Sequence, residues 1–167
     1  MKFSVFSVSI PDWEPGEAIS TLQAQGWDGI EWRVVDQEPA EEASFWRGNR
    51  ATVPFTGVAE SLAAAVRLAN EGGIAVSGIG SYVPCDDRES VETILDAVAN
   101  AGANRVRINV PQLGGAPYPD LFDTARRDYE WVAQRAAVHG VTALVEIHHR
   151  TIVSSASAAR RFVDGLV

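Results

Sequence analysis

Cysteine is almost absent from this chain of 167 residues, in which Cys85 is the only one. A lone cysteine cannot form an intramolecular disulfide, and it disfavours a metal site built on thiolates. Long apolar runs are missing too, since none approaches the roughly 18 residues that a membrane helix needs. The first ten residues lack a small-residue cleavage site and are interpreted as a strand, not a signal peptide. We therefore expect a cytoplasmic protein with no membrane partner.

Basic residues are outnumbered, with 14 Lys and Arg against 22 Asp and Glu, which gives a formal charge of −8. A protein that holds nucleic acid mainly through its phosphates needs a basic stripe. The arginines here are dispersed, and the adjacent pairs Arg126-Arg127 and Arg160-Arg161 fall in predicted helices, where a solvated helix face explains them. We expect a small-molecule partner and no nucleic acid.

Short apolar stretches alternate along the chain with amphipathic ones. The alternation predicts five strands, at residues 2–9, 29–35, 74–79, 105–110 and 141–148. Each is followed by a predicted helix: the first runs from Pro15 to Gly26, the second spans 58–71, the next two end at Gly102 and Gly140, and the last spans 154–164. Such repeated β/α units indicate right-handed crossovers and a parallel sheet. No G-x-G-x-x-G fingerprint follows the first strand, which disfavours a dinucleotide-binding fold.

Three of the predicted strands have one polar and one apolar side. Glu31 and Arg33 share a side in the second strand, and Glu146 and His148 share a side in the fifth; the fourth strand places Arg105, Arg107 and Asn109 opposite Val106, Ile108 and Val110. Strands of a doubly wound sheet are apolar on both sides. A barrel explains the pattern better, because its apolar side meets the helices and its polar side points inward, towards the active-site mouth.

The motifs Gly29-Ile-Glu-Trp-Arg33, Asn49-Arg-Ala-Thr52 and Leu144-Val-Glu-Ile-His148, in this order, resemble those of the xylose isomerase-like family. The resemblance implies an α/β fold, a (β/α)₈ TIM barrel of which about five β/α units are present. Residues 1–167 would form a single domain, the N-terminal part of such a barrel. The implied function is a sugar isomerase or epimerase of carbohydrate metabolism. A dehydratase of the inosose type and an abasic-site endonuclease share the fold and stay open as alternatives.

The resemblance also implies which residues carry the chemistry. Glu146 matches a glutamate that is a metal ligand and a catalytic proton carrier in the family, and His148 matches a catalytic position that faces substrate oxygens. The metal would be divalent: Mn²⁺, Mg²⁺ or Co²⁺, with Zn²⁺ also allowed. It would polarise the carbonyl of a sugar or cyclitol substrate, which reacts through an enediolate. The remaining ligands would come from three strands that follow the fifth.

Four further residues are predicted to contact the substrate: Glu31, Arg33, Tyr82 and Asn109. For the charged side chains Glu31, Arg33 and Arg107 a purely structural ion-pair network is the competing interpretation. Trp13, Trp46 and Tyr82 follow the first three predicted strands, where they form either aromatic walls for a sugar ring or ordinary loop packing. The side chain of His149 is expected to point away from His148, towards helices or solvent.

A complete barrel needs roughly 250 residues, so about a third would be missing. Five strands alone would expose two sheet edges and the barrel interior, which predicts a longer polypeptide or a homo-oligomer that covers them. We therefore expect the 167-residue chain by itself to show no isomerase activity. A coupled assay on the purified chain measures this, and detectable turnover of a ketose would contradict the expectation.

Overall fold

The computed structural model of the chain describes residues 1–166. Five parallel strands form one sheet in the order β1-β2-β3-β4-β5. The strands are β1 Ser4–Phe6, β2 Gly29–Val34, β3 Ala75–Pro84, β4 Arg105–Asn109 and β5 Thr142–Leu144. The helices are α1 Pro15–Ala24, α2 Val58–Glu71, α3 Arg88–Asn100, α4 Tyr118–Val138 and α5 Ala156–Val163, and a 3₁₀ helix η1 spans Ser7–Ser9.

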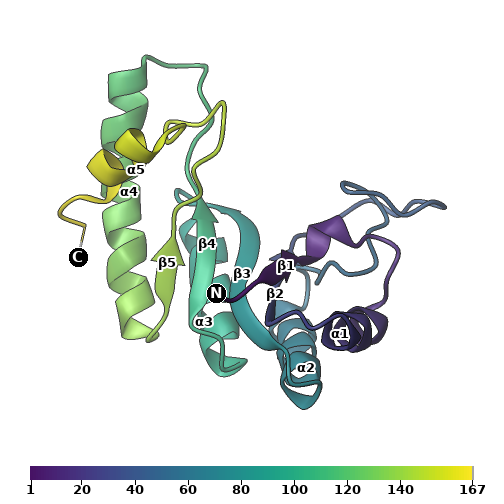
Figure 1. Cartoon of the computed structure of the whole chain (residues 1–167). Helices are drawn as coiled ribbons and strands as arrows, with labels where there is room; N and C mark the ends of the chain where they lie inside the picture. The colour runs from purple at the N-terminus through teal and green to yellow at the C-terminus, as the bar shows by residue number, and fades with distance from the viewer. Residues whose placement is uncertain (167) are drawn as a thin grey trace.

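The helices form a single layer on the outer face of the sheet. When every strand pairs with the next one in the chain, right-handed crossovers place each connecting helix on the same face. Consecutive helices accordingly contact one another, from α1 against α2 to α4 against α5. Figure 1 shows this layer wrapping around the curved sheet, with β1 and β5 at its two edges. This is the arrangement of a barrel wall, and a doubly wound sheet would carry helices on both faces.

The outer face of the sheet holds the hydrophobic core, as the alternation of side chains predicts. Ile30, Trp32 and Val34 of β2 are buried, together with Val106 and Ile108 of β4. The opposite side chains of these strands, Glu31, Arg33, Arg107 and Asn109, lie on the inner face. Polar groups therefore collect on the concave side while the apolar residues pack beneath the helices.

The predicted second and fourth strands are nearly right, but the other three need correction. The first strand is shorter than residues 2–9, because η1 follows it from Ser7. The third runs on past residue 79 to Pro84, so Tyr82 lies on β3 and not in a loop. The fifth ends at Leu144, and residues 145–148 leave the sheet. The last residue pair between β4 and β5 is Arg107 with Leu144, and the pairing of the two strands ends there.

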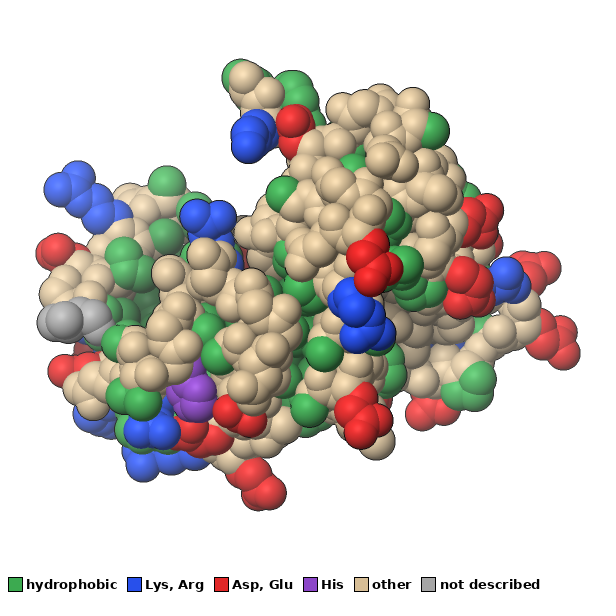
Figure 2. Space-filling model, turned by 90° about the horizontal axis from the view of Figure 1, so that it is seen from below, with side chains coloured by type: hydrophobic (Ala, Val, Ile, Leu, Met, Phe, Trp, Pro, Cys, Tyr) green, Lys and Arg blue, Asp and Glu red, His purple; other side chains and the backbone are tan. Residues whose placement is uncertain are grey.

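No helix within residues 1–166 has the length and apolar character needed to cross a membrane. Figure 2 shows one face of the molecule, where Lys and Arg side chains are scattered among Asp and Glu side chains. A scattered distribution of this kind differs from the basic stripe that phosphate-dominated binding requires.

The single cysteine gives a test of the packing at the end of β3. Cys85 is buried, and burial, helped by the nearby acids Asp128 and Asp86, raises the pKa of its thiol to about 12. Since the thiolate is the reactive form, the folded protein should not react with an aromatic disulfide reagent at pH 8. Reaction in denaturant is the positive control. Rapid stoichiometric reaction of the folded chain would contradict the burial of Cys85.

Candidate active site on the inner face of the sheet

A cavity of about 650 Å³ opens on the inner face, beyond the carboxyl ends of the strands. Its volume suits a small polar ligand. Aromatic side chains supply part of its wall, from Phe6, Phe45, Trp46 and Tyr82. Hydrogen-bonding side chains supply much of the remainder, from Ser9, Arg107, Asn109, Gln112, Glu146, His148 and Thr151, and Val8, Pro84, Val110 and Pro111 complete it. Flat rings beside polar groups can pack against the apolar face of a sugar and bond its hydroxyls.

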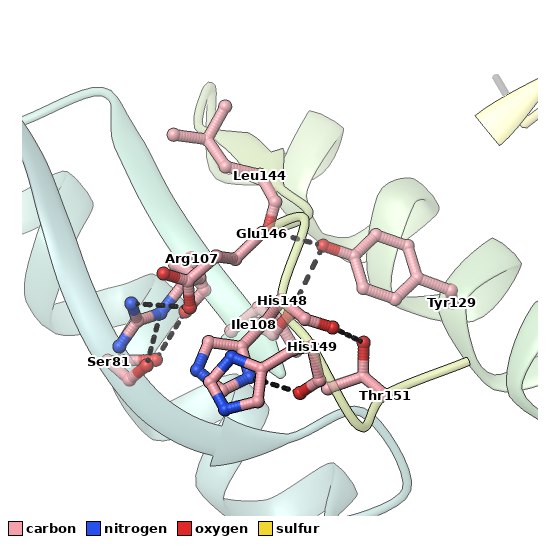
Figure 3. A network of polar contacts seen from close by, with 9 residues as sticks. All are labelled: Ser81, Arg107, Ile108, Tyr129, Leu144, Glu146, His148, His149 and Thr151. Carbon is pink, nitrogen blue, oxygen red and sulfur yellow. Dashed lines mark hydrogen bonds and ion pairs between the residues drawn. The ribbon is translucent and has the colours of Figure 1, made fainter. Parts of the chain in front are cut away.

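An ion pair between Arg107 and Glu146 lies at the centre of this wall. Arg107 Nη1 donates to Glu146 Oε2 at 2.8 Å. The Arg107 side chain is only 8% exposed, whereas the Glu146 side chain is 45% exposed. The cation is therefore part of the protein interior, and the carboxylate lines the cavity. Figure 3 shows the Glu146 side chain directed at the Arg107 guanidinium.

Four further contacts hold Arg107 in place, three of them on its guanidinium. Its Nε donates to the carbonyl oxygen of Ser81 at 3.1 Å, and the Ser81 hydroxyl donates back to the Arg107 carbonyl. The guanidinium carbon lies 4.8 Å from the ring centre of Tyr82 and 5.6 Å from that of Phe6. Cation–π contacts of this kind stabilise a buried guanidinium and fix its plane.

The segment after β5 carries Glu146 and the two histidines. The hydroxyl of Tyr129 donates to the Leu144 carbonyl at 2.7 Å and so ties α4 to the end of β5. The turn that follows is closed by Thr151, whose hydroxyl donates to the His148 carbonyl at 2.8 Å. The rings of His148 and His149 stack with their centres 4.2 Å apart. The expectation that His149 points away from His148 is therefore wrong, since strand alternation does not extend into this turn.

Glu31 lies on the inner face, where both members of the ion pair affect its carboxyl. Burial raises the pKa of its carboxyl, Arg107 lowers it, and Glu146 raises it, with burial the largest effect. The carboxylate has room because residue 80 is a glycine. A Cβ added to Gly80 would meet Phe6 Cε2 at 2.7 Å and Glu31 Oε1 at 2.9 Å. Because Gly80 has no side chain, the side chains of Phe6 on β1 and Glu31 on β2 can lie close to the backbone of β3.

Arg33 anchors the loop that follows β2. Its Nη1 donates to the Phe45 carbonyl at 2.7 Å, and its guanidinium packs against the rings of Trp46 and Tyr82. Asn49 fixes the same loop, since its Nδ2 donates to the Val8 carbonyl at 3.1 Å. These contacts give the motif at residues 49–52 a structural role. They also bring Phe45 and Trp46 over the cavity.

The structure brings four of the six predicted site residues to the cavity wall: Glu146, His148, Tyr82 and Asn109. Glu31 and Arg33 are on the predicted side of β2 but lie below or beside the wall and do not line it. Trp46 lines the cavity and Trp13 does not. The residue that the site prediction missed is Arg107. Arg107 shares the polar side of the predicted fourth strand with Asn109, and this pattern would have been enough to predict it as a site residue.

The resemblance implies a divalent metal on Glu146, and the side chains present do not form such a centre. Within residues 1–166 no three His, Cys, Asp or Glu side chains are grouped so that they could hold a metal ion. Glu146 is the single carboxylate of the described cavity wall, and one of its oxygens is bonded to a guanidinium. A divalent ion at Glu146 would need ligands other than these and would face the positive charge of Arg107.

The fold is shared with solved sugar-enzyme structures. No protein-family model and no curated protein sequence matches the chain. The structure of 3-keto-D-glucoside 4-epimerase YcjR from E. coli has a TM-score of 0.69 at 15% identity, with 99% of this chain and 64% of that chain covered. A xylose isomerase domain containing protein from Salmonella typhimurium gives 0.68 at 14% identity, over 99% and 57% of the two chains.

A third similar structure is the IolI protein with a bound zinc atom, which has a TM-score of 0.72 at 12% identity and coverage of 99% and 59%. The chain therefore has the fold of a xylose isomerase-like barrel, as the motifs predicted, and the likeness at these identities is one of fold. It spans less than two thirds of the length of these structures. Five parallel β/α units make it a partial barrel.

Replacing Glu31 by glutamine should stabilise the folded chain in a pH-dependent way. Because the folded pKa of Glu31 is raised, the unfolded state releases its proton first as pH rises. The free energy of unfolding then falls between the ordinary and the raised pKa. Glu31→Gln removes this loss, so its unfolding free energy should match the wild type in acid and exceed it at neutral pH. Urea unfolding at several pH values measures the difference.

The matched control is Glu130→Gln, which changes an exposed glutamate on α4. It should show no comparable gain at neutral pH. A Glu31→Gln variant less stable than the wild type at neutral pH would contradict the dominance of burial over the Arg107 attraction.

Proposed function

We propose that this chain forms the substrate-binding side of an isomerase or epimerase that acts on a sugar-like α-hydroxy carbonyl compound through an enediolate. The observation that carries the proposal is the half-exposed Glu146 carboxylate, which reaches from a fixed Arg107 into a cavity with aromatic and hydrogen-bonding walls. The fold supports it, because similar structures include a keto-glucoside epimerase.

In the proposed reaction, Glu146 removes a proton from one carbon of the substrate and returns it to the next. Its carboxylate takes the hydrogen beside the carbonyl as a proton, and the electrons of the broken C–H bond form the C=C bond of the enediolate while the carbonyl oxygen becomes an oxyanion. The new Glu146 carboxyl then returns the proton to the former carbonyl carbon. The hydroxyl group on the other carbon gives its proton to the oxyanion and becomes the new carbonyl, which completes the isomerisation. One carboxylate on one face suffices for isomerisation, whereas inversion of a centre needs a second acid on the opposite face.

Neighbouring side chains have matching tasks. Donors at the oxyanion lower the barrier when they are fixed before the reaction begins, and Arg107 is such a donor. His148 and Asn109 line the same wall and can orient hydroxyl groups. Trp46 and Tyr82 can cover the apolar face of the sugar and exclude water. Metal dependence, which the resemblance implies, would require ligands in addition to the described ones, since Glu146 alone cannot hold a divalent ion firmly.

A hydroxamic acid tests the proposal without turnover, because its planar N–C=O group imitates an enediolate. Its O–H and N–H can donate to Glu146 while its carbonyl oxygen accepts from Arg107. A site complementary to the enediolate should bind a four-carbon sugar hydroxamate about tenfold or more tightly than the corresponding ketose. Isothermal titration in buffer with a chelator compares the two ligands.

The same titrations on Glu146→Gln should show the preference for the hydroxamate lost, while Glu130→Gln keeps it. Equal affinity of the wild type for ketose and hydroxamate, or a preference that survives Glu146→Gln, would overturn the assignment of Glu146. Nucleic acid is the alternative ligand, and tighter binding of abasic DNA than of either sugar ligand would favour the endonuclease interpretation.

A further inference from the structure

The cavity wall carries a cation where the resemblance places a metal ion. We infer that Arg107 is the built-in counter-ion of Glu146 and competes with a divalent metal ion for the Glu146 carboxylate. It is a positioning residue for that carboxylate, and its charge weakens the binding of a metal ion there. This inference concerns cation binding, so it can succeed or fail independently of the sugar chemistry.

The contact geometry supports competition between the two cations. Arg107 Nη1 lies 2.8 Å from Glu146 Oε2, which is the distance of a strong charge-assisted hydrogen bond. A metal ion on the same oxygen would displace this hydrogen bond. A bound ion elsewhere on the carboxylate would still lie within a few ångströms of the guanidinium, where two positive charges repel strongly in a partly buried site.

Arg107 cannot easily move aside to admit a metal ion. Its side chain is 8% exposed and is held by the Ser81 carbonyl and by the rings of Tyr82 and Phe6. Swinging the guanidinium away would bury an unpaired charge or break these contacts, both of which are costly. Glu146 is the accessible partner of the pair, since nearly half of its side chain is exposed.

Removing the guanidinium would leave carboxylates without a cation. Glu31 is close enough to both partners of the ion pair that Arg107 lowers the pKa of its carboxyl and Glu146 raises it, beside the larger effect of burial. Without Arg107, the repulsion between the Glu31 and Glu146 carboxylates would no longer be offset by a guanidinium. Such a pair attracts a hard divalent cation, for which carboxylate oxygens are the preferred ligands.

Under the proposed isomerase function, on which this step rests, Arg107 has a second task. Its N–H groups already face the cavity beside Glu146, where the enediolate oxygen would form. A guanidinium there supplies fixed positive charge at the oxyanion, the contribution otherwise made by a metal ion. The positive charge that stabilises the oxyanion would then be in place in the cavity wall before any ligand binds.

The test is a Mn²⁺ titration of the full chain, with free Mn²⁺ measured by electron paramagnetic resonance. Wild type should bind Mn²⁺ weakly. Arg107→Met keeps an extended apolar side chain and removes the charge, and it should bind Mn²⁺ about tenfold more tightly. Arg107→Lys keeps the charge and should bind as weakly as the wild type. The double variant Arg107→Met with Glu146→Gln should lose the gain.

Each outcome decides the inference. Unchanged Mn²⁺ affinity in Arg107→Met would overturn it, as would a gain that survives in the double variant or an equal gain in Arg107→Lys. Circular dichroism and urea unfolding establish that each variant is folded, and the charge-conserving lysine variant separates competition from a change of packing. No sugar is present in this titration, so equal affinity of the wild type for hydroxamate and ketose would count against the proposed function and leave the Mn²⁺ result standing.

Discussion

The structure depends on one constraint of chain direction: each strand pairs in parallel with the next one in sequence. With right-handed crossovers, that order leaves helices on one face only. The outer face must then be apolar, and Trp32 and Ile108 are buried there. The inner face cannot be covered by helices of the same units, so its side chains must satisfy one another or meet solvent. Every functional feature of the molecule follows from this division of the sheet into two unlike faces.

Two buried arginines meet this requirement in different ways. Arg107 has a carboxylate partner, and its pairing with Glu146 neutralises it at the cavity wall. Arg33 donates to neutral oxygen atoms and packs against aromatic rings. Its positive charge is therefore stabilised by contacts with the loop that it anchors. Tyr82 lies against both guanidinium groups. The ion-pair network expected among Glu31, Arg33 and Arg107 is not among the ion pairs of residues 1–166, since Arg107 pairs with Glu146 and Arg33 bonds a carbonyl oxygen.

The parts of the fold and of the site that could be predicted are those with a regular pattern in the sequence. Strand alternation in residues 29–35 and 105–110 placed Glu31, Arg33, Arg107 and Asn109 on the correct face, because both strands have neighbours on two sides. Tyr82 was missed as a strand residue because Gly80 resembles a strand-ending break, although its missing Cβ makes room for Phe6 and Glu31. The turn around His148 depends on a side-chain hydrogen bond from Thr151, which has no periodic signature.

The difference between Arg107 and a metal ion has a chemical consequence for the kind of reaction that this wall of the cavity favours. A guanidinium donates hydrogen bonds in one plane and keeps its charge at any physiological pH, but it cannot exchange ligands or change its coordination number. It suits an oxyanion that forms at one fixed place, as in transfer of a proton between neighbouring carbons on one face. Inversion at a single carbon requires a second acid across the sugar, and Glu146 is the single carboxylate of the described wall. Under the proposed function, the pair of Arg107 and Glu146 would therefore support proton transfer on one face of the substrate.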